Sequence, residues 1–264
     1  MIEQYLTPDT PKQALELMQQ YGDEAIWFAG GSKINATPTK SDCTVAIALS
    51  KLDLSDVKQQ GNSLHIGAMC RIQQLIEHEL VPAAIKQSAA FIYSRHIRNQ
   101  ATLGGEIAAR QPEAVLVPCL MAMQAELLLA DGQQVSTEVY LQQEVRELIT
   151  EVIIPDVTLS CIGYNLTRSA AGLAVVTAAV SVDRSGNKVI ALDGVAPLKN
   201  GAAQPIRLRD VEGQDLKGEL LEQAVADAIY PVADLCGSVE YKRYIAGIVV
   251  TDLMMECQQL AQEA

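Results

Sequence analysis

The chain has 264 residues, of which 49% are hydrophobic and 20% are charged, so it is long and apolar enough to fold around a sizeable core. Its 20 Lys and Arg against 32 Asp and Glu give a net charge of −12, which argues against a nucleic-acid or anionic-membrane surface. The segment from Met1 to Gln4 carries an acid and lacks an apolar stretch, and the apolar run from Val115 to Met123 is too short to cross a bilayer. We therefore predict a cytoplasmic protein.

The N-terminal half begins with a helix between Thr10 and Gly22. Thr10 is a favourable N-cap, Pro11 suits the first helical position, and Gly22 is typical of a helix end. The pattern then predicts, in order, short buried strands over 25–28 and 44–49, a strand over 63–68, and helices over 72–79 and 82–93.

The middle of the chain contains a polar, basic stretch over 95–100, which we predict to be a loop. A further helix is predicted from Pro112 to about Met123. Two strands follow as a hairpin around the Asp131–Gly132 turn, and a strand over 148–154 ends at Pro155.

The character of the sequence changes near residues 155–159, where we place a boundary. Beyond it the pattern predicts three strands and then two helices, over 162–166, 173–182, 189–192, 218–235 and 239–259. The sequence therefore predicts an α+β fold, with a larger N-terminal part followed by a smaller part of antiparallel sheet and helices.

The cysteine and histidine residues lack the spacing of a metal site. A zinc site or an iron–sulfur cluster needs closely spaced thiolates, and the chain has no C-x-x-C pair. We expect isolated, reduced and mostly buried thiols, so any redox chemistry must come from a bound cofactor. The cysteines are Cys43, Cys70, Cys119, Cys161, Cys236 and Cys257.

Two glycine pairs, Gly30–Gly31 and Gly104–Gly105, are candidates for contact with a ligand. Glycine permits a close approach of the backbone, and successive N–H groups suit a pyrophosphate. Arg95 and Arg98 could add positive charge near the second pair. Neither pair belongs to a G-x-G-x-x-G fingerprint or a Walker loop, so on spacing alone each pair is either an ordinary turn or a nucleotide-binding loop.

The stretches around both pairs carry longer motifs. Ala29-Gly30-Gly31-Ser32 fits the pattern A-G-G-[TS], and Ile97 to Ala108 fits I-R-N-x-A-T-[IL]-G-G-N-[IL]-A at all but one position. Further matches occur at 147–155, 173–179, 194–197 and 237–243. In these motifs, which follow one another in order across nearly the whole chain, the sequence resembles the FAD-binding subunit of the molybdenum hydroxylases, the family that includes xanthine dehydrogenase and carbon monoxide dehydrogenase.

The resemblance implies a two-lobed FAD-binding domain of the vanillyl-alcohol-oxidase (PCMH) type over 1–157, split near residue 55. A C-terminal domain of the carbon-monoxide-dehydrogenase-flavoprotein type would follow over 158–264. It implies no catalytic residue and no metal ligand in this chain. The residues that it places on FAD are Ala29, Gly30, Gly31, Ser32, Lys33, Thr102, Leu103, Gly104, Gly105, Glu106 and Leu148.

The family resemblance also implies partners. A molybdopterin-binding large subunit would hydroxylate the substrate, and a [2Fe–2S] small subunit would pass the electrons to FAD. The reduced flavin would then deliver them to NAD+ or another acceptor. This chain would be an oxidoreductase subunit that does not hydroxylate a substrate alone.

Four positions depart from the family pattern. Glu106 stands where the family usually has Asn, and Val115 stands where it usually has Asp. Lys33 replaces a frequent Asp, and Asn165 stands where some relatives have Lys. A carboxylate near a pyrophosphate is repulsive, so the alternative is a flavin-free, degenerate structural or assembly subunit. A stand-alone FAD oxidase is a third reading, but nothing in the sequence resembles a substrate-activating base.

Overall fold

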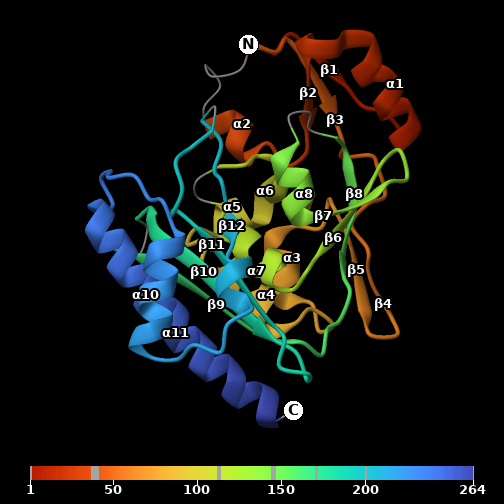
Figure 1. The fold of residues 1–264 in the computed structure, drawn as a ribbon. Coiled ribbons are helices and arrows are strands. Elements are labelled where there is room, and N and C mark those ends of the chain that lie inside the picture. The colour runs from red at the N-terminus through yellow and green to blue at the C-terminus, as the bar shows by residue number, and fades with distance from the viewer. Residues whose placement is uncertain are drawn as a thin grey trace.

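The computed structural model describes residues 2–36, 42–111, 114–143, 147–169, 172–199 and 201–263. Its strands form three sheets, and helices pack between and around them (Figure 1). No helix in these residues has both the length and the apolar character needed to cross a membrane.

The first sheet is parallel and lies at the N-terminal end of the molecule. It has the order β1 (Gln4–Leu6), β3 (Val45–Ala48), β2 (Ala25–Phe28). Helix α1 (Pro11–Tyr21) packs on it and begins at Thr10, whose hydroxyl accepts a hydrogen bond from the Gln13 N–H at 3.2 Å. A 3₁₀ turn, η1 (Gly22–Glu24), leads into β2, and the short helix α2 (Ser32–Ala36) follows β2.

The second sheet is antiparallel and has five strands. Their order is β4 (Val57–Gln60), β5 (Ser63–Gly67), β8 (Ile149–Ile154), β6 (Glu126–Leu129), β7 (Gln134–Ser136). Alternate residues such as Leu64, Ile66 and Val152 point into the core. The helices of this part are α3 (Ile72–Glu77), α4 (Ala83–Ala90), α5 (Arg95–Gln100), α6 (Leu103–Ala108), α7 (Val117–Ala122) and α8 (Thr137–Gln142).

The third sheet is antiparallel and forms a layer between two sets of helices. Its order is β12 (Ile206–Arg207), β11 (Lys188–Asp193), β10 (Ala174–Val182), β9 (Ser160–Thr167), and the helices after it are α9 (Arg209–Glu212), α10 (Glu219–Ala228) and α11 (Val239–Glu263). Val176 and Val180 face the core shared with α10 and α11. On the other face, the Ser181 hydroxyl donates to the Ala122 carbonyl at the end of α7, at 2.6 Å. The sheet is therefore joined to the N-terminal part through α7.

The α+β architecture predicted from the sequence is confirmed, and most predicted strands lie within two residues of their expected positions. Two predictions are wrong. Residues 95–100 form α5 rather than a loop, and the helix predicted to reach residue 235 ends at Ala228. Pro231 explains the second difference, because a proline disfavours helical backbone in the residue before it. The start of the helix predicted at Pro112 lies outside the described residues, and α7 begins at Val117.

All six cysteines are free thiols. Burial raises the pKa of Cys70 and Cys257 to about 11, so both stay protonated and unreactive near neutral pH. Cys119 and Cys161 are not isolated as predicted, because they lie beside each other where α7 meets β9, and the neighbouring Cys119 thiol together with burial raises the pKa of Cys161 well above its usual value. Within the described residues, no group of three or more His, Cys, Asp or Glu side chains could hold a metal ion.

Candidate cofactor-binding site

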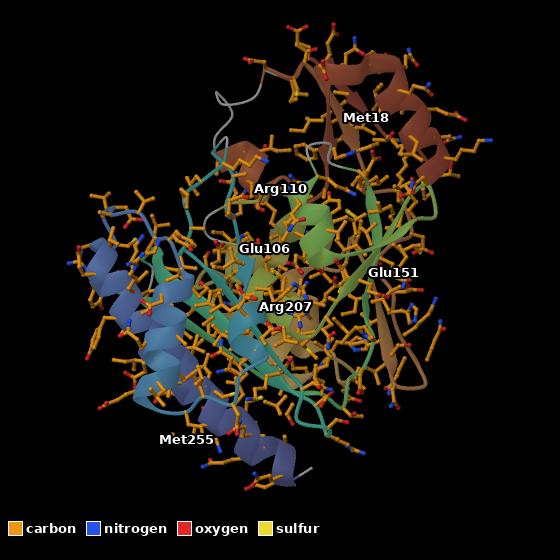
Figure 2. All side chains as sticks on the ribbon, in the orientation of Figure 1. Met18, Glu106, Arg110, Glu151, Arg207 and Met255 are labelled. Atoms are coloured by element: carbon orange, nitrogen blue, oxygen red, sulfur yellow. The ribbon has the colours of Figure 1, made fainter. Side chains whose placement is uncertain are left out.

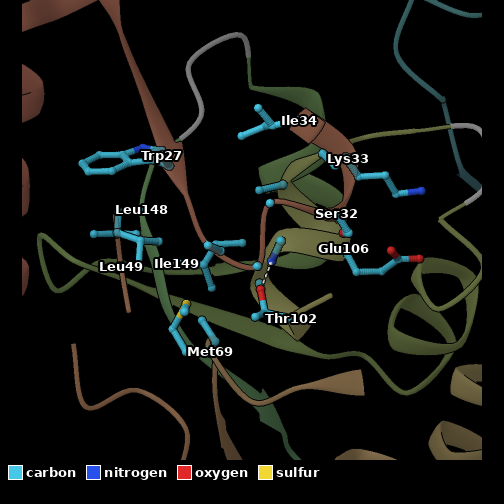
Figure 3. A pocket seen from close by; sticks show the side chains of 18 of the residues that line it. Trp27, Ser32, Lys33, Ile34, Leu49, Met69, Thr102, Glu106, Leu148 and Ile149 are labelled. Atoms are coloured by element: carbon cyan, nitrogen blue, oxygen red, sulfur yellow. Dashed lines mark hydrogen bonds between the residues drawn. The ribbon is translucent and has the colours of Figure 1, made fainter. Parts of the chain in front are cut away.

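The two glycine loops face each other across a cavity of about 310 Å3. It lies where the loop after β2, the N-terminal end of α6 and the start of β8 meet (Figure 3). Ten of the eleven residues predicted to contact FAD line this cavity. The remaining one, Leu103, is fully buried in the core and does not line it.

The first loop leaves backbone donors at the cavity wall. Gly31 has a φ of +71°, a conformation that favours glycine, and its carbonyl accepts the Asn35 N–H at 2.9 Å. That bond is the first of α2, so the N–H groups of Ser32 and Ile34 precede the hydrogen-bonded part of the helix. Both residues line the cavity. The chain reversal after β2 therefore presents backbone N–H groups to a ligand.

The second loop is held by bonds within the protein. The Thr102 hydroxyl caps α6 by accepting the Gly105 N–H at 3.2 Å, and the Gly104 N–H donates to the Ala68 carbonyl at 2.8 Å. A Cβ at Gly104 would lie 2.8 Å from the Cβ of Ala68, so the glycine also permits close packing. The second loop therefore shapes the cavity, while its own N–H groups are engaged elsewhere.

Gly30 explains how the two loops come together. A Cβ placed on it would lie 1.8 Å from the Gln100 carbonyl oxygen, which is far inside van der Waals contact. The absence of a side chain thus allows the first loop to lie directly against the segment that leads into the second.

The opposite end of the cavity is apolar. Trp27, Leu49, Met69, Leu148 and Ile149 form this wall, and Figure 3 shows them at one end with Lys33 and Glu106 at the other. Leu148 was among the predicted FAD contacts, whereas Trp27 and Met69 were not predicted from the sequence. One signal was available, because Trp27 is the only tryptophan of the chain and lies two residues before the first glycine loop.

The charged end of the cavity carries Lys33 and Glu106. Glu106 is only 3% exposed, and Figure 2 places it in the interior of the molecule. The prediction that Arg95 and Arg98 add positive charge at this site is wrong. Arg98 donates to the side chain of Gln73 and to two backbone carbonyls, and Arg95 pairs with Glu77, so neither lines the cavity.

A second cavity of about 270 Å3 adjoins the first, because Lys33 and Glu106 line both. It lies between the segment after α4 and the facing ends of β9 and β10. Its wall is mostly apolar, with Phe91, Ile92, Ile97 and Leu173 among its members. All four positions that depart from the family pattern, namely Lys33, Glu106, Val115 and Asn165, line this second cavity.

Comparison with known proteins agrees with this architecture. Residues 1–157 match the family described as the FAD binding domain in molybdopterin dehydrogenase. The chain is 52% identical, over the whole of both chains, to the uncharacterized protein YgfM of Escherichia coli K12. It is 28% identical to the carbon monoxide dehydrogenase medium chain of Hydrogenophaga pseudoflava, covering 94% of each chain.

The solved structures show the same fold. Carbon monoxide dehydrogenase from Hydrogenophaga pseudoflava superposes with a TM-score of 0.84 at 24% identity, covering 100% of this chain and 98% of that one. Quinoline 2-oxidoreductase from Pseudomonas putida 86 gives a TM-score of 0.81 at 19% identity, covering 98% and 97%.

Fold and site together define a flavin-binding subunit of an oxidoreductase. The chain belongs to the family of FAD-binding domains of molybdopterin dehydrogenases, as the FAD-binding medium subunit of a molybdenum hydroxylase.

Proposed function

We propose that this chain holds one FAD across the two adjoining cavities and uses it to pass electrons between partner subunits and an acceptor. The observation that carries the proposal is the first cavity, which combines backbone donors at Ser32 and Ile34 with an apolar wall at Trp27 and Leu148. An anionic pyrophosphate suits the donors, and an aromatic ring suits the apolar wall.

The residues present fit such a group. The N–H groups of the first loop and the Lys33 ammonium would hold the pyrophosphate. Gly30 and Gly105 leave room for the loops to approach it, and Thr102 holds the second loop in place. When bound, the flavin supplies the electron-transfer chemistry, and the protein supplies binding, orientation and electrostatics. The contacts with FAD that the sequence predicts for residues 29–33, 102–106 and 148 remain predictions.

The partners that we propose are a molybdopterin-binding large subunit and a [2Fe–2S] small subunit, with NAD+ or another molecule as the final acceptor. Support comes from the relatives, one of which is a carbon monoxide dehydrogenase medium chain and another a nicotinate dehydrogenase FAD-subunit from Eubacterium barkeri. The proposed boundary between an FAD-binding domain, 1–157, and a C-terminal domain, 158–264, falls between the second and third sheets.

The alternative, a flavin-free structural or assembly subunit, has one observation in its favour. Glu106 places a buried carboxylate at the junction of the two cavities, where it would repel a pyrophosphate. Lys33 lines the same junction and would offset part of that repulsion.

A fluorescence titration separates the two functions. Because Trp27 is the only tryptophan and lines the first cavity, bound FAD is expected to quench most of the protein's tryptophan emission at a 1:1 ratio. The variant Trp27→Phe is the control for absorption of light by the added FAD. Its remaining emission comes from tyrosine, and FAD should reduce that emission no more than it reduces the emission of free tyrosine in solution. Emission that stays unchanged up to a large excess of FAD would favour the flavin-free alternative.

Replacing Glu106 with Gln should tighten FAD binding by about tenfold. Removing one negative charge beside the pyrophosphate is expected to make the free energy of FAD binding more favourable by about 1.4 kcal/mol. The same Trp27 titration measures it. The control is Glu151→Gln, which removes a carboxylate that lies outside both cavities, on the five-stranded sheet, where it binds His65 (Figure 2). FAD binding that weakens in Glu106→Gln would mean that the carboxylate helps to hold the cofactor.

A further inference from the structure

The second cavity contains a neutral hydrogen-bond donor whose orientation is fixed by the protein. We propose that Asn165, held by Thr177, raises the reduction potential of the bound flavin. The proposal rests on the proposed function, since it requires the flavin ring of the bound FAD, and not its adenine, to lie in the second cavity.

Asn165 and Thr177 are neighbours on the third sheet. Asn165 on β9 lies opposite Thr177 on β10 in the register of the sheet, so their side chains share one face. That face is the one turned toward the N-terminal part, because Ala179 and Ser181 on the same strand pack against it. Asn165 lines the second cavity, whereas Thr177 is 4% exposed and lies behind it.

Thr177 fixes the orientation of the Asn165 amide. The Thr177 hydroxyl donates to the Asn165 Oδ1 at 2.9 Å. An amide has one oxygen, which accepts, and one nitrogen, which only donates. With Oδ1 bound to the buried hydroxyl, the Nδ2 group is the part of the amide left to face the cavity. Thr177 is thus a positioning residue that turns Asn165 into a donor.

The Asn165 amide would act on the cofactor in mostly apolar surroundings. The other walls of the second cavity are mostly apolar, including Phe91, Val115 and Leu173, so a hydrogen bond there is little weakened by water. A reduced flavin is more electron-rich than an oxidised one, and hydrogen bonds to its ring are among the means by which a protein tunes it. A donor at this place stabilises the reduced form more than the oxidised form.

The test is a reductive titration of the FAD-loaded chain against a reference dye, with FAD affinity measured separately by Trp27 emission. Asn165→Asp replaces the donor by an acceptor of the same shape, and should lower the ratio of reduced to oxidised flavin at a fixed dye potential at least tenfold, about 30 mV for a two-electron couple. Thr177→Val should lower the ratio about threefold by releasing the amide, while Thr177→Ser keeps the hydroxyl and should restore the native ratio.

Thr158→Val is the matched control for Thr177→Val, because the Thr158 hydroxyl donates to Asp156 and lies outside both cavities. It should leave the ratio within twofold of the native value. An unchanged ratio in Asn165→Asp, or an equal shift in Thr158→Val, would overturn the inference while leaving the proposed function intact. A native chain that binds no FAD would instead overturn the proposed function, and the inference with it.

Discussion

Replacing Gly30 with alanine is expected to weaken FAD binding by about 100-fold or more, because a shift of about 1 Å in a binding loop is enough for such a loss. The added methyl group would lie 1.8 Å from the Gln100 carbonyl oxygen and 2.8 Å from its carbon. Both are backbone atoms that cannot rotate away, so the two glycine loops must separate. The same overpacking should lower the free energy of unfolding by about 1–3 kcal/mol.

The matched control for Gly30→Ala is Gly213→Ala. Gly213 has a φ of −73°, and the nearest atom to an added Cβ is the Arg209 carbonyl oxygen at 3.8 Å, an ordinary contact. This variant should bind FAD as the native chain does and unfold at the same urea concentration. If Gly30→Ala retained native affinity in the Trp27 titration, the close contact between the loops would not matter for binding.

Replacing Arg110 with alanine should lower the free energy of unfolding by about 3 kcal/mol, because charge-assisted hydrogen bonds in the interior are lost. Arg110 is 8% exposed and follows the end of α6 in the chain. Its guanidinium donates to the carbonyls of Gln143 and of Tyr140, the latter at 2.8 Å, and lies 5.4 Å from the centre of the Tyr140 ring. The measurement is urea unfolding followed by circular dichroism.

Arg110 also has an unusual backbone. Its φ is +49°, and its carbonyl accepts the Ala203 N–H at 2.9 Å, which ties the segment before β12 to the N-terminal part. Arg209→Ala is the control, since the Arg209 side chain is 59% exposed and its ion pair with Glu138 is a surface pair worth about 1 kcal/mol or less. A loss below 1 kcal/mol in Arg110→Ala would show that these buried contacts contribute little.

The sequence predicted the long, strongly patterned elements. The helix between Thr10 and Gly22 has both capping signals, and the structure contains both. The hairpin at Asp131–Gly132 follows from its turn residues, and Gly132 has a φ of +88° as such a turn requires. Elements of this kind are dictated by local chemistry, so local reasoning finds them.

Short elements were not predicted from the sequence, because tertiary contacts rather than local patterns stabilise them. Strand β1 has three residues, and its pairing with β3 joins segments some 40 positions apart, which no local pattern reveals. Helix α5 has six residues, of which all but Ile97 are polar or basic, and it has no apolar stripe, so it was predicted to be a loop. The helix is nevertheless anchored by Arg98, whose side chain binds Gln73 and the Ile92 carbonyl.

The glycine loops of the candidate site could be predicted from the sequence, but most residues of its apolar wall could not. Glycine pairs and their flanking motifs are local signals, and they located the first cavity. Leu49 and Met69 line it only because separate segments meet there, and that meeting depends on the whole fold. The sequence likewise could not predict that the four positions that depart from the family pattern line one cavity, namely Lys33, Glu106, Val115 and Asn165.

The central claim is that the two glycine loops of this chain hold FAD. The most direct measurement is the visible absorption spectrum of the purified chain after incubation with FAD and desalting. We predict flavin bands near about 370 and 450 nm that survive desalting at one FAD per chain, since the flavin is the group that carries the chemistry. The claim would be contradicted if the fully folded native chain stayed colourless after this treatment and the Glu106→Gln variant stayed colourless as well.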